Sequence, residues 1–393
     1  MSDHNPALGI ITSIASNQPK IHSGVRLKYW LQSCARELVS NERVSHCLRS
    51  HAPLKEIVEI HRSIEGKTAY YKGLQVCGSV WMCPVCASRI SEERKRELLS
   101  GIQAWNGSMV MVTYTLSHHR AMKLFDLVNA ELEAYRALKA GGAFMKLRDE
   151  YYWRGSVRTI ELTYGENGWH PHIHELVFVN NGKTKILDSV YTGGLKGAIF
   201  RYWKQALNHK GYGADFTHGL DVTTAKDTVA EYIAKWGRDP INPEWTVAAE
   251  ITKQPVKQAR KGGRTPTAIL FDYGEGVPGM GKLWREYAYA MKGRNQLVWS
   301  RNMRDELGIG KEKPDGEIAA DVPASSVLLA SLNKAQWKII LKADSRADVL
   351  HHAANETEEE FSQWLGNHLE EWDIPEIVRP NHNPYSSHSP FID

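Results

Sequence analysis

The sequence predicts an α+β fold in which a central antiparallel sheet is flanked by helices. A cysteine-rich segment precedes this core and a helical region follows it. Two observations favour this arrangement. Runs rich in β-branched residues alternate with helical stretches, and two of these runs are joined by a short turn typical of antiparallel hairpins. All five cysteines fall within residues 26–100, and they include one Cys-x-x-Cys.

Composition excludes several classes of protein. A hydrophobic content of 42% and a charged content of 24% suit globular cores, and a net charge of +4 means that any nucleic-acid surface is local. No apolar run is long enough to cross a bilayer, and the first residues lack the pattern of a secretory signal. We therefore expect a cytoplasmic protein without a membrane partner. In such a protein, Cys-x-x-Cys favours metal binding over disulfides.

Six segments are expected along the chain. They are a flexible leader (1–25), a cysteine-rich zinc-binding segment (26–100), a main domain with a basic extension (101–310), a linker (311–324), a helical C-terminal region (325–378) and a disordered tail (379–393). β-branched runs predict strands over 108–116, 156–164 and 172–179. Helical spacing of apolar residues predicts helices over 91–105, 121–140, 196–210, 226–237 and 282–294. Asn355 is expected to cap a later helix, with Glu358 at the capping-box position.

The stretch GWHPHIHELVFV (168–179) carries His170, His172 and His174 at alternate positions. Alternate side chains of a strand point to one face, so His172 and His174 lie about 7 Å apart on the same side. This spacing allows one metal ion between them. An ordinary pair of hydrogen-bonded imidazoles on a half-buried sheet is the alternative interpretation.

The preceding strand adds a carboxylate to this face. If Asn167 and Gly168 form the turn, as in common hairpins, Glu161 lies opposite His174. A four-residue loop instead places Glu161 opposite His172. Both registers put Glu161 on the histidine face, and mixed nitrogen and oxygen ligands suit Mn²⁺, Mg²⁺ or a catalytic Zn²⁺. His170, nearer the turn, is expected to support the site or contact DNA.

The stretch EYIAKW places Tyr232 and Lys235 on one face of an expected helix. Tyrosine is a possible covalent nucleophile, although its pKa near 10 requires help from a neighbouring cation or a polarised electrophile. A surface tyrosine beside an extended lysine is the alternative.

The cysteines predict a structural zinc site. Cys83 and Cys86 form a metal knuckle, and Cys77 lies six residues before it. We expect Cys47 as the fourth ligand of a closed tetrahedral site, with Cys34 or His46 as alternatives. A set of buried free thiols is the other interpretation.

Residues 251–264 are basic and contain no acid, which predicts contacts with DNA phosphates that weaken as salt rises. A solvated loop is the alternative. Trp169 and Trp236 could stack on unpaired bases. GVPGMGKL resembles a P-loop but has Leu283 where Mg²⁺ needs a hydroxyl, so the protein would depend on a separate helicase. The basic side chains of this segment are Lys253, Lys257, Arg260, Lys261 and Arg264.

Taken together, these motifs resemble those of HUH endonucleases, and specifically the replication initiators of rolling-circle plasmids. MVTYTLS (111–117) resembles the first motif of that family, HPHIH (170–174) its metal motif and EYIAKW (231–236) its Tyr-x-x-Lys motif. CGSVWMCPVCA (77–87) is similar to the cysteine segment of plasmid Rep proteins. The resemblance extends over roughly residues 45–310 and implies an HUH nuclease domain.

The resemblance implies a mechanism. Glu161, His172 and His174 would hold Mn²⁺ or Mg²⁺ at the scissile phosphate of single-stranded origin DNA. Tyr232 would attack phosphorus, giving a 5′-phosphotyrosine link and a free 3′-OH, with Lys235 steadying the charge. A host polymerase would extend the 3′ end.

One position departs from the family pattern. Thr228 stands where related initiators often carry a second tyrosine or a glutamate, so the second transfer would fall to the partner of a dimer or to an activated water. An HUH-type transposase or relaxase is an alternative with the same chemistry. A non-catalytic DNA-binding regulator with a structural metal site, or a zinc hydrolase of small molecules, would not use Tyr232.

Overall fold

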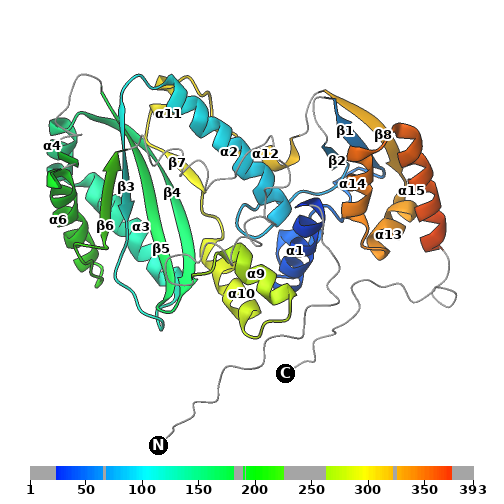
Figure 1. Ribbon diagram of the computed structural model, residues 1–393, viewed down its shortest axis with the longest axis horizontal. Coiled ribbons are helices and arrows are strands. Elements are labelled where there is room, and N and C mark those ends of the chain that lie inside the picture. Colours follow the sequence, from blue (N-terminus) through cyan, green and yellow to red (C-terminus); the bar gives the residue numbers. More distant parts are fainter. Residues whose placement is uncertain are drawn as a thin grey trace, which may run out of the picture.

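The computed structural model describes most of the chain between residues 24 and 373. The described ranges are 24–64, 68–180, 189–190, 192–224, 263–321 and 325–373. These residues form an α+β fold with two antiparallel sheets and flanking helices, as the sequence predicted (Figure 1). Several predicted features lie outside the described residues: the helix over 226–237 with Tyr232, Lys235 and Trp236, four basic residues (Lys253, Lys257, Arg260 and Lys261), and the tail.

The central sheet has five strands in the order β6-β3-β5-β4-β7, and each neighbouring pair is antiparallel. The predicted strands over 108–116, 156–164 and 172–179 are confirmed, while the two short edge strands were not predicted. The strands are β3 (Ser108–Tyr114), β4 (Trp153–Gly165), β5 (Gly168–Val179), β6 (Leu220–Thr224) and β7 (Leu297–Trp299).

The turn between β4 and β5 differs from the favoured expectation. Gly165 pairs with Gly168, so the turn is formed by residues 166 and 167. The expected turn at Asn167-Gly168 is wrong, because it needs a positive φ at both residues and only Gly168 has one, at +88°. The register that results pairs Glu161 with His172, as in the second predicted register.

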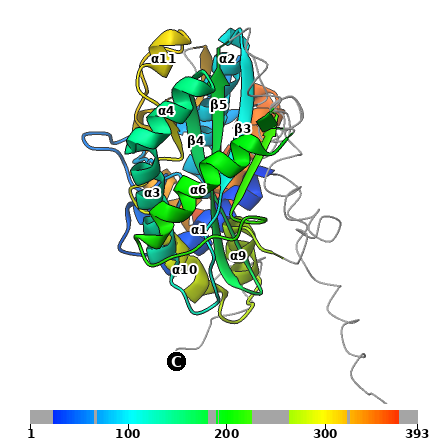
Figure 2. The same ribbon diagram turned by 90° about the vertical axis from the view of Figure 1, so that its left-hand side faces the viewer.

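Helices cover one face of the central sheet (Figure 2). They are α3 (Leu124–Ala140), α4 (Gly142–Glu150) and α6 (Gly194–Asn208). The odd-numbered residues of β5 point to this side, and Ile173, Val177 and Val179 are fully buried there. Trp169 shares that parity and is only 2% exposed, packed near Tyr287, so the expectation that it stacks on bases is wrong.

A buried ionic cluster interrupts this apolar face. The Glu175 carboxylate accepts hydrogen bonds from the hydroxyls of Tyr114 (2.9 Å) and Tyr135 (2.7 Å), and it lies 2.8 Å from Lys139 Nζ. Burial lowers the pKa of Lys139 to about 8, and its ammonium lies 3.9 Å from the ring centre of Trp153. These contacts tie β5 to α3 directly beside the last histidine.

The opposite face is divided into two halves. One half forms a small apolar core under α2 (Pro84–Ala104) and α11 (Met303–Glu306). Leu98, Met111, Leu176 and Phe178 are buried in this core. The other half carries the even-numbered residues near the start of β5, which include the histidines.

A second unit lies at the far end of the molecule from the central sheet (Figure 1). Its three-stranded sheet has the order β2-β1-β8, so a strand of the C-terminal region pairs with the cysteine-rich segment. The elements are β1 (Val58–Ser63), β2 (Ala69–Lys72), β8 (Ser326–Leu332), α13 (Lys334–Lys342), α14 (Arg346–Asn355) and α15 (Glu358–Asp373). These two parts of the chain, distant in sequence, therefore share one core.

The remaining elements connect the two units. They are α1 (Gly24–Leu38), the 3₁₀ helix η1 (Arg43–His46), α9 (Pro266–Gly274), α10 (Met280–Met291) and α12 (Asp315–Ala320). The segment expected to be a linker, 311–324, contains α12, which packs against α2 and buries Ile318 and Ala319. None of the helices in the described ranges has the length and apolar character that a membrane span requires.

The cap expected at Asn355 is wrong, because that residue still belongs to α14. Thr357 precedes α15 instead. Its hydroxyl accepts a hydrogen bond from the Glu360 amide (3.2 Å), and the Glu360 carboxylate accepts one from the Thr357 amide (3.0 Å). This is the capping box that the sequence placed two residues too early.

Glu175→Gln should reduce the free energy of unfolding by about 3 kcal/mol, because it leaves the buried Lys139 ammonium without its counter-charge. Glu133→Gln on α3 is a matched control, since it breaks only the exposed pair with Lys210 and should lower stability far less than Glu175→Gln does. Urea denaturation measures both. Equal losses in the two variants would contradict the role given to Glu175.

Candidate functional site

Three histidines near the start of β5 form a row on one face of the central sheet. They lie on the half of that face that α2 and α11 do not cover. His170, His172 and His174 are each half-buried, and the residues between them are buried on the other face. Pairing with β4 places Glu161 beside His172, and pairing with β3 places Thr113 beside His174. The predicted common face of Glu161 and the histidines is therefore present.

Two threonine hydroxyls, one in β3 and one directly after it, each hold one nitrogen of one of these rings. Thr113 Oγ1 lies 3.0 Å from Nδ1 of His174, and Thr115 Oγ1 lies 3.4 Å from Nδ1 of His172. Holding an imidazole at one ring nitrogen sets its orientation and prepares the other nitrogen to coordinate an ion. In both rings that other nitrogen is Nε2.

Glu161 meets His174 diagonally across the hairpin. Its Oε2 lies 2.7 Å from His174 Nε2. Two ligands bonded to one ion at about 2.1 Å and at right angles lie about 3 Å apart, so this spacing is close to that of neighbouring ligands. The ring centres of His172 and His174 are 5.8 Å apart, and these residues do not form a group whose donor atoms all lie within 4.8 Å of one another. An ion at this site would need His172 to move closer.

A fourth histidine, His118, extends the row and was not predicted. Its ring stacks on that of His170 with 4.6 Å between ring centres, and its Nδ1 donates to the Leu116 carbonyl at 3.2 Å. Burial, together with the neighbouring His118, lowers the pKa of His170 to about 4, so that ring is neutral at neutral pH. His118 follows the predicted strand over 108–116 by two residues. The sequence could have pointed to His118, because it follows a strand that pairs with the histidine strand β5.

Two further residues near the row were not predicted. Asp221 of β6 pairs with Thr113, so its exposed side chain lies on the histidine face. Arg120 lies in the loop after β3, which packs tightly on the β4–β5 turn. A Cβ atom at Gly168 would lie 2.9 Å from the Cα of Arg120, so glycine permits this contact.

The basic segment ends next to the hairpin. Arg264, its last basic residue, exchanges two backbone hydrogen bonds with Tyr164 of β4, at 2.7 and 2.8 Å. The Arg264 guanidinium is 2.8 Å from Asp272, so part of its charge is already balanced. Arg264 is therefore held beside Tyr164, which lies three residues from Glu161 on β4.

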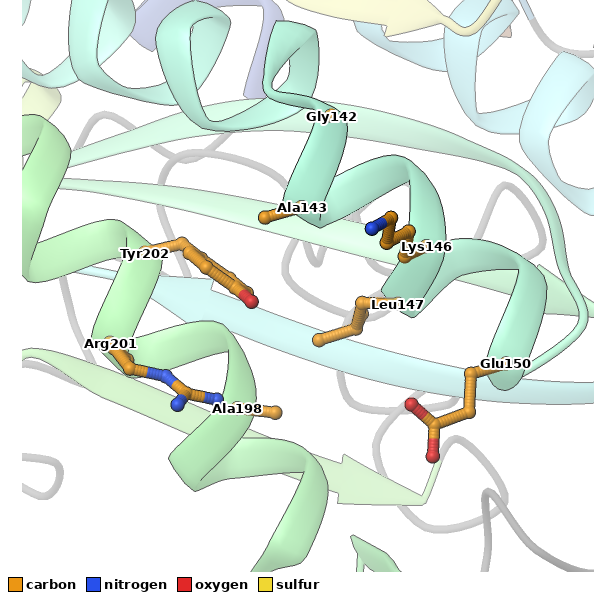
Figure 3. Close-up of a pocket in the computed structure, with 8 residues that line it drawn as sticks. All are labelled: Gly142, Ala143, Lys146, Leu147, Glu150, Ala198, Arg201 and Tyr202. Carbon is orange, nitrogen blue, oxygen red and sulfur yellow. The ribbon is translucent and has the colours of Figure 1, made fainter.

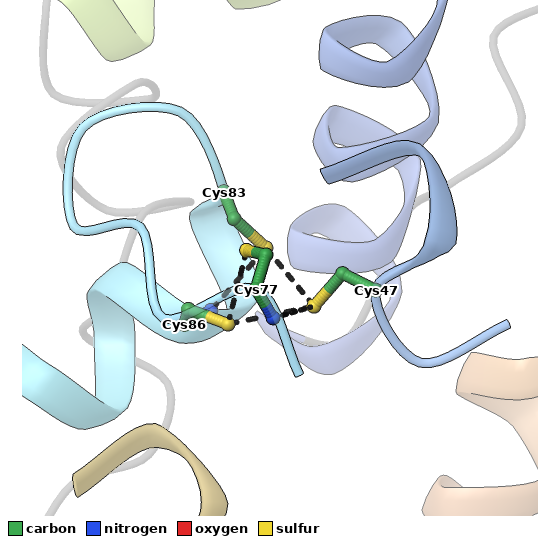
Figure 4. A group of neighbouring side chains, drawn as sticks. All are labelled: Cys47, Cys77, Cys83 and Cys86. Carbon is green, nitrogen blue, oxygen red and sulfur yellow. Dashed lines mark hydrogen bonds between the residues drawn. The ribbon is translucent and has the colours of Figure 1, made fainter. Parts of the chain in front are cut away.

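Four buried cysteines form a compact group (Figure 4). The Sγ atoms of Cys47 and Cys86 are 3.5 Å apart, those of Cys77 and Cys86 3.6 Å, and those of Cys83 and Cys47 3.8 Å. Zn–S bonds of about 2.3 Å give tetrahedral edges of about 3.8 Å, whereas a disulfide needs about 2.05 Å. The four thiols could therefore bind a metal such as zinc. Cys47 is the fourth member, and the alternatives Cys34 and His46 lie outside the group.

Local structure prepares these sulfurs for a metal. Cys83 caps α2 and Cys86 lies in its first turn, where the helix dipole favours thiolates. Backbone amides also donate to the sulfurs: Cys77 to Cys47 (3.4 Å), Ser79 to Cys77 (3.5 Å) and Cys86 to Cys83 (3.5 Å). Cys47 directly follows η1, which brings a distant part of the chain to the group.

A hollow of about 580 Å³ lies on the other side of the central sheet, between α4 and α6 (Figure 3). Lys146, Glu150, Arg201 and Tyr202 line it. It contains none of the predicted site residues, so the histidine face and this hollow are separate features of the molecule.

Cys77→Ser should lower the zinc content of the purified protein well below one ion per chain, because the site loses one of its four tetrahedral ligands. Cys34→Ser is the control, since this buried cysteine lies outside the group and its loss should leave the zinc content unchanged. Elemental analysis of both variants measures the effect. Equal zinc contents in the two variants would contradict the assignment.

Comparison with known proteins gives two relatives. The chain is 30% identical over 306 residues to a protein named Protein rep from Streptomyces lividans, an alignment that covers 62% of this chain and 66% of that protein. It is 32% identical over 142 residues to a Neomycin resistance protein from Streptomyces cyanogenus, covering 29% of this chain and 32% of that protein. The chain thus spans just under two thirds of the first relative and about a third of the second. No family model matches the chain, and no solved structure matches it significantly. Its similarity is therefore to a Rep protein, over more than half of its own length.

Proposed function

We propose that this chain is a plasmid rolling-circle replication initiator, an HUH-type enzyme that nicks and rejoins single-stranded origin DNA. The contact between His174 Nε2 and Glu161 Oε2, at 2.7 Å on a face of oriented imidazoles, is the observation that carries the proposal. The similarity to Protein rep supports replication as the setting.

In this proposal Glu161, His172 and His174 hold Mn²⁺ or Mg²⁺. The bound ion would supply Lewis-acid stabilisation of charge on a non-bridging oxygen of the scissile phosphate. The hydroxyls of Thr113 and Thr115 hold the two imidazoles in position. Their role is positioning, because each bonds the ring nitrogen on the side away from the proposed ligand atom.

Tyr232 is the proposed nucleophile. Its phenol oxygen forms a bond to phosphorus while the bond from phosphorus to the 3′ oxygen breaks, leaving a 5′-phosphotyrosine and a protonated 3′-OH. Lys235 stabilises the negative charge on the phenolate or the phosphate. The 3′-OH is the substrate for a host polymerase, and a later transfer to that hydroxyl releases Tyr232 and joins the strand.

The strand being cut would cross the histidine row. His170 is neutral at neutral pH and can donate to or accept from DNA without adding charge. The basic side chains Lys253, Lys257, Arg260, Lys261 and Arg264 would contact phosphates of the same strand. Binding through these cations should weaken as salt rises.

Two other functions fit part of the same features. An HUH-type transposase or relaxase would use the same residues and differ in the DNA on which it acts. A DNA-binding regulator would keep the metal site without a covalent step. The Rep similarity favours the initiator, and dependence on a host helicase and on a partner subunit for the second transfer belongs to the same proposal.

Tyr232→Phe should abolish the covalent protein–DNA adduct while leaving DNA binding within about threefold of wild type, because only the attacking oxygen is removed. Tyr289→Phe is the control, since Tyr289 is an exposed tyrosine of α10 and should keep full adduct formation. A denaturing gel with single-stranded DNA from the native replicon and Mn²⁺ measures the adduct. Adduct formation by Tyr232→Phe would contradict the assignment, and its absence in wild type despite binding would favour the regulator.

A further inference from the structure

A buried arginine of the C-terminal unit lies one side chain away from the four-cysteine group. Arg346, at the start of α14, is 1% exposed, and its Nη1 donates to Oε1 of Gln32 at 2.8 Å. Gln32 of α1 is also 1% exposed, and its Nε2 donates to Cys83 Sγ at 3.3 Å. Two consecutive hydrogen bonds thus connect the guanidinium to a sulfur of the group.

The charge of Arg346 is only weakly balanced by a carboxylate. Asp344 is 4.0 Å from Nη2 and is half exposed, while Nε has no hydrogen-bond partner among the described residues. Asp344 is shared with a second cation, since Arg49 Nη1 lies 3.9 Å from it. The remaining contacts of Arg346 include the Leu48 carbonyl at 3.3 Å and the ring of Tyr29 at 4.9 Å. A guanidinium remains protonated when buried, and a buried charge that is incompletely balanced is strongly unfavourable.

A loaded four-cysteine site supplies the missing charge. Thiolates bind the metal in deprotonated form, so four of them with one Zn²⁺ carry two excess negative charges in the buried interior. The amide of Gln32 is oriented to suit both partners, with its oxygen toward Arg346 and its NH₂ toward Cys83.

We propose that Arg346 is the buried counter-charge of the metal-loaded cysteine site, and that Gln32 transmits its effect to Cys83. Arg346 is a positioning residue in this arrangement and not a ligand. The proposal depends on metal binding by the four cysteines and is independent of the nickase function.

The proposal gives the C-terminal unit a role. Its side chains also hold the loop that follows the first ligand: Arg346 Nη1 donates to the Leu48 carbonyl, and Trp337 Nε1 donates to the Arg49 carbonyl at 2.7 Å. Residues 325–373 therefore complete the site formed by Cys47 and its partners. Metal binding and docking of this unit should depend on each other.

The test measures metal affinity in the full-length protein, by Co²⁺ absorption and by competition for Zn²⁺ with a chromophoric chelator. Arg346→Met and Gln32→Leu should each weaken binding about 10- to 100-fold, the usual effect of losing an outer-sphere partner. Arg26→Met is the matched control, because Arg26 and Asp348 pair α1 with α14 at a partly exposed position that does not reach the cysteines. It should remain within about threefold of wild type.

Circular dichroism identifies which variants are folded, and Gln32→Leu tests the proposal even if Arg346→Met does not fold. Hydrogen exchange gives a second measurement on wild type, where chelation should increase exchange in α14 while β5 stays protected. Unchanged affinity in folded Gln32→Leu would overturn the proposal, as would an equal loss in Arg26→Met. Wild-type protein that binds no metal at the cysteines, or whose α14 exchange is unchanged by chelation, would overturn it too.

Discussion

The pairing register of β4 with β5 is the constraint on which the rest of this structure depends. Side chains alternate between the two faces of a strand, so a slip of one residue would exchange every contact of the hairpin. In the observed register Glu161 faces the histidines, and Glu175 points to the opposite side against α3. The histidine strand β5 therefore presents its histidines on one face and buried residues that pack against the helices on the other.

The two faces support each other. Glu175 directly follows His174 in the chain, and its contacts with Lys139 and two tyrosines fix the backbone at the end of the histidine row. On the other face, the hydroxyls of Thr113 and Thr115 hold the imidazoles. Because protein interiors are closely packed, these contacts on both sides fix the backbone from which the histidine side chains extend.

Much of the fold was predictable because its signals are local. Alternation of β-branched residues located three strands of the central sheet, and residue parity placed Glu161 with the histidines. The cysteine spacing identified three members of the four-cysteine group, and Cys47 was expected as the fourth, with Cys34 and His46 as alternatives. These features depend on neighbours within a few residues or on chemistry that few other arrangements satisfy.

The features that were missed depend on contacts between distant parts of the chain. The pairing of β8 with β1 and the contact of Arg346 with Gln32 join residues roughly 300 positions apart, and no local pattern indicates them. Trp169 looks suited to stacking on bases, yet strand parity places it in the core. His118 lies just beyond a predicted strand end, where the direction of a side chain depends on how the loop packs.

Manganese binding to the histidine face tests the central claim most directly. Mn²⁺ prefers oxygen and nitrogen ligands over thiolates, so a zinc-loaded protein should bind it at the histidines, and electron paramagnetic resonance reports the free ion. Glu161→Gln should weaken binding at least about tenfold, whereas Glu166→Gln, an exposed position in the same hairpin turn, should leave it unchanged. Equal affinity in the two variants, or no binding by wild type, would contradict the account.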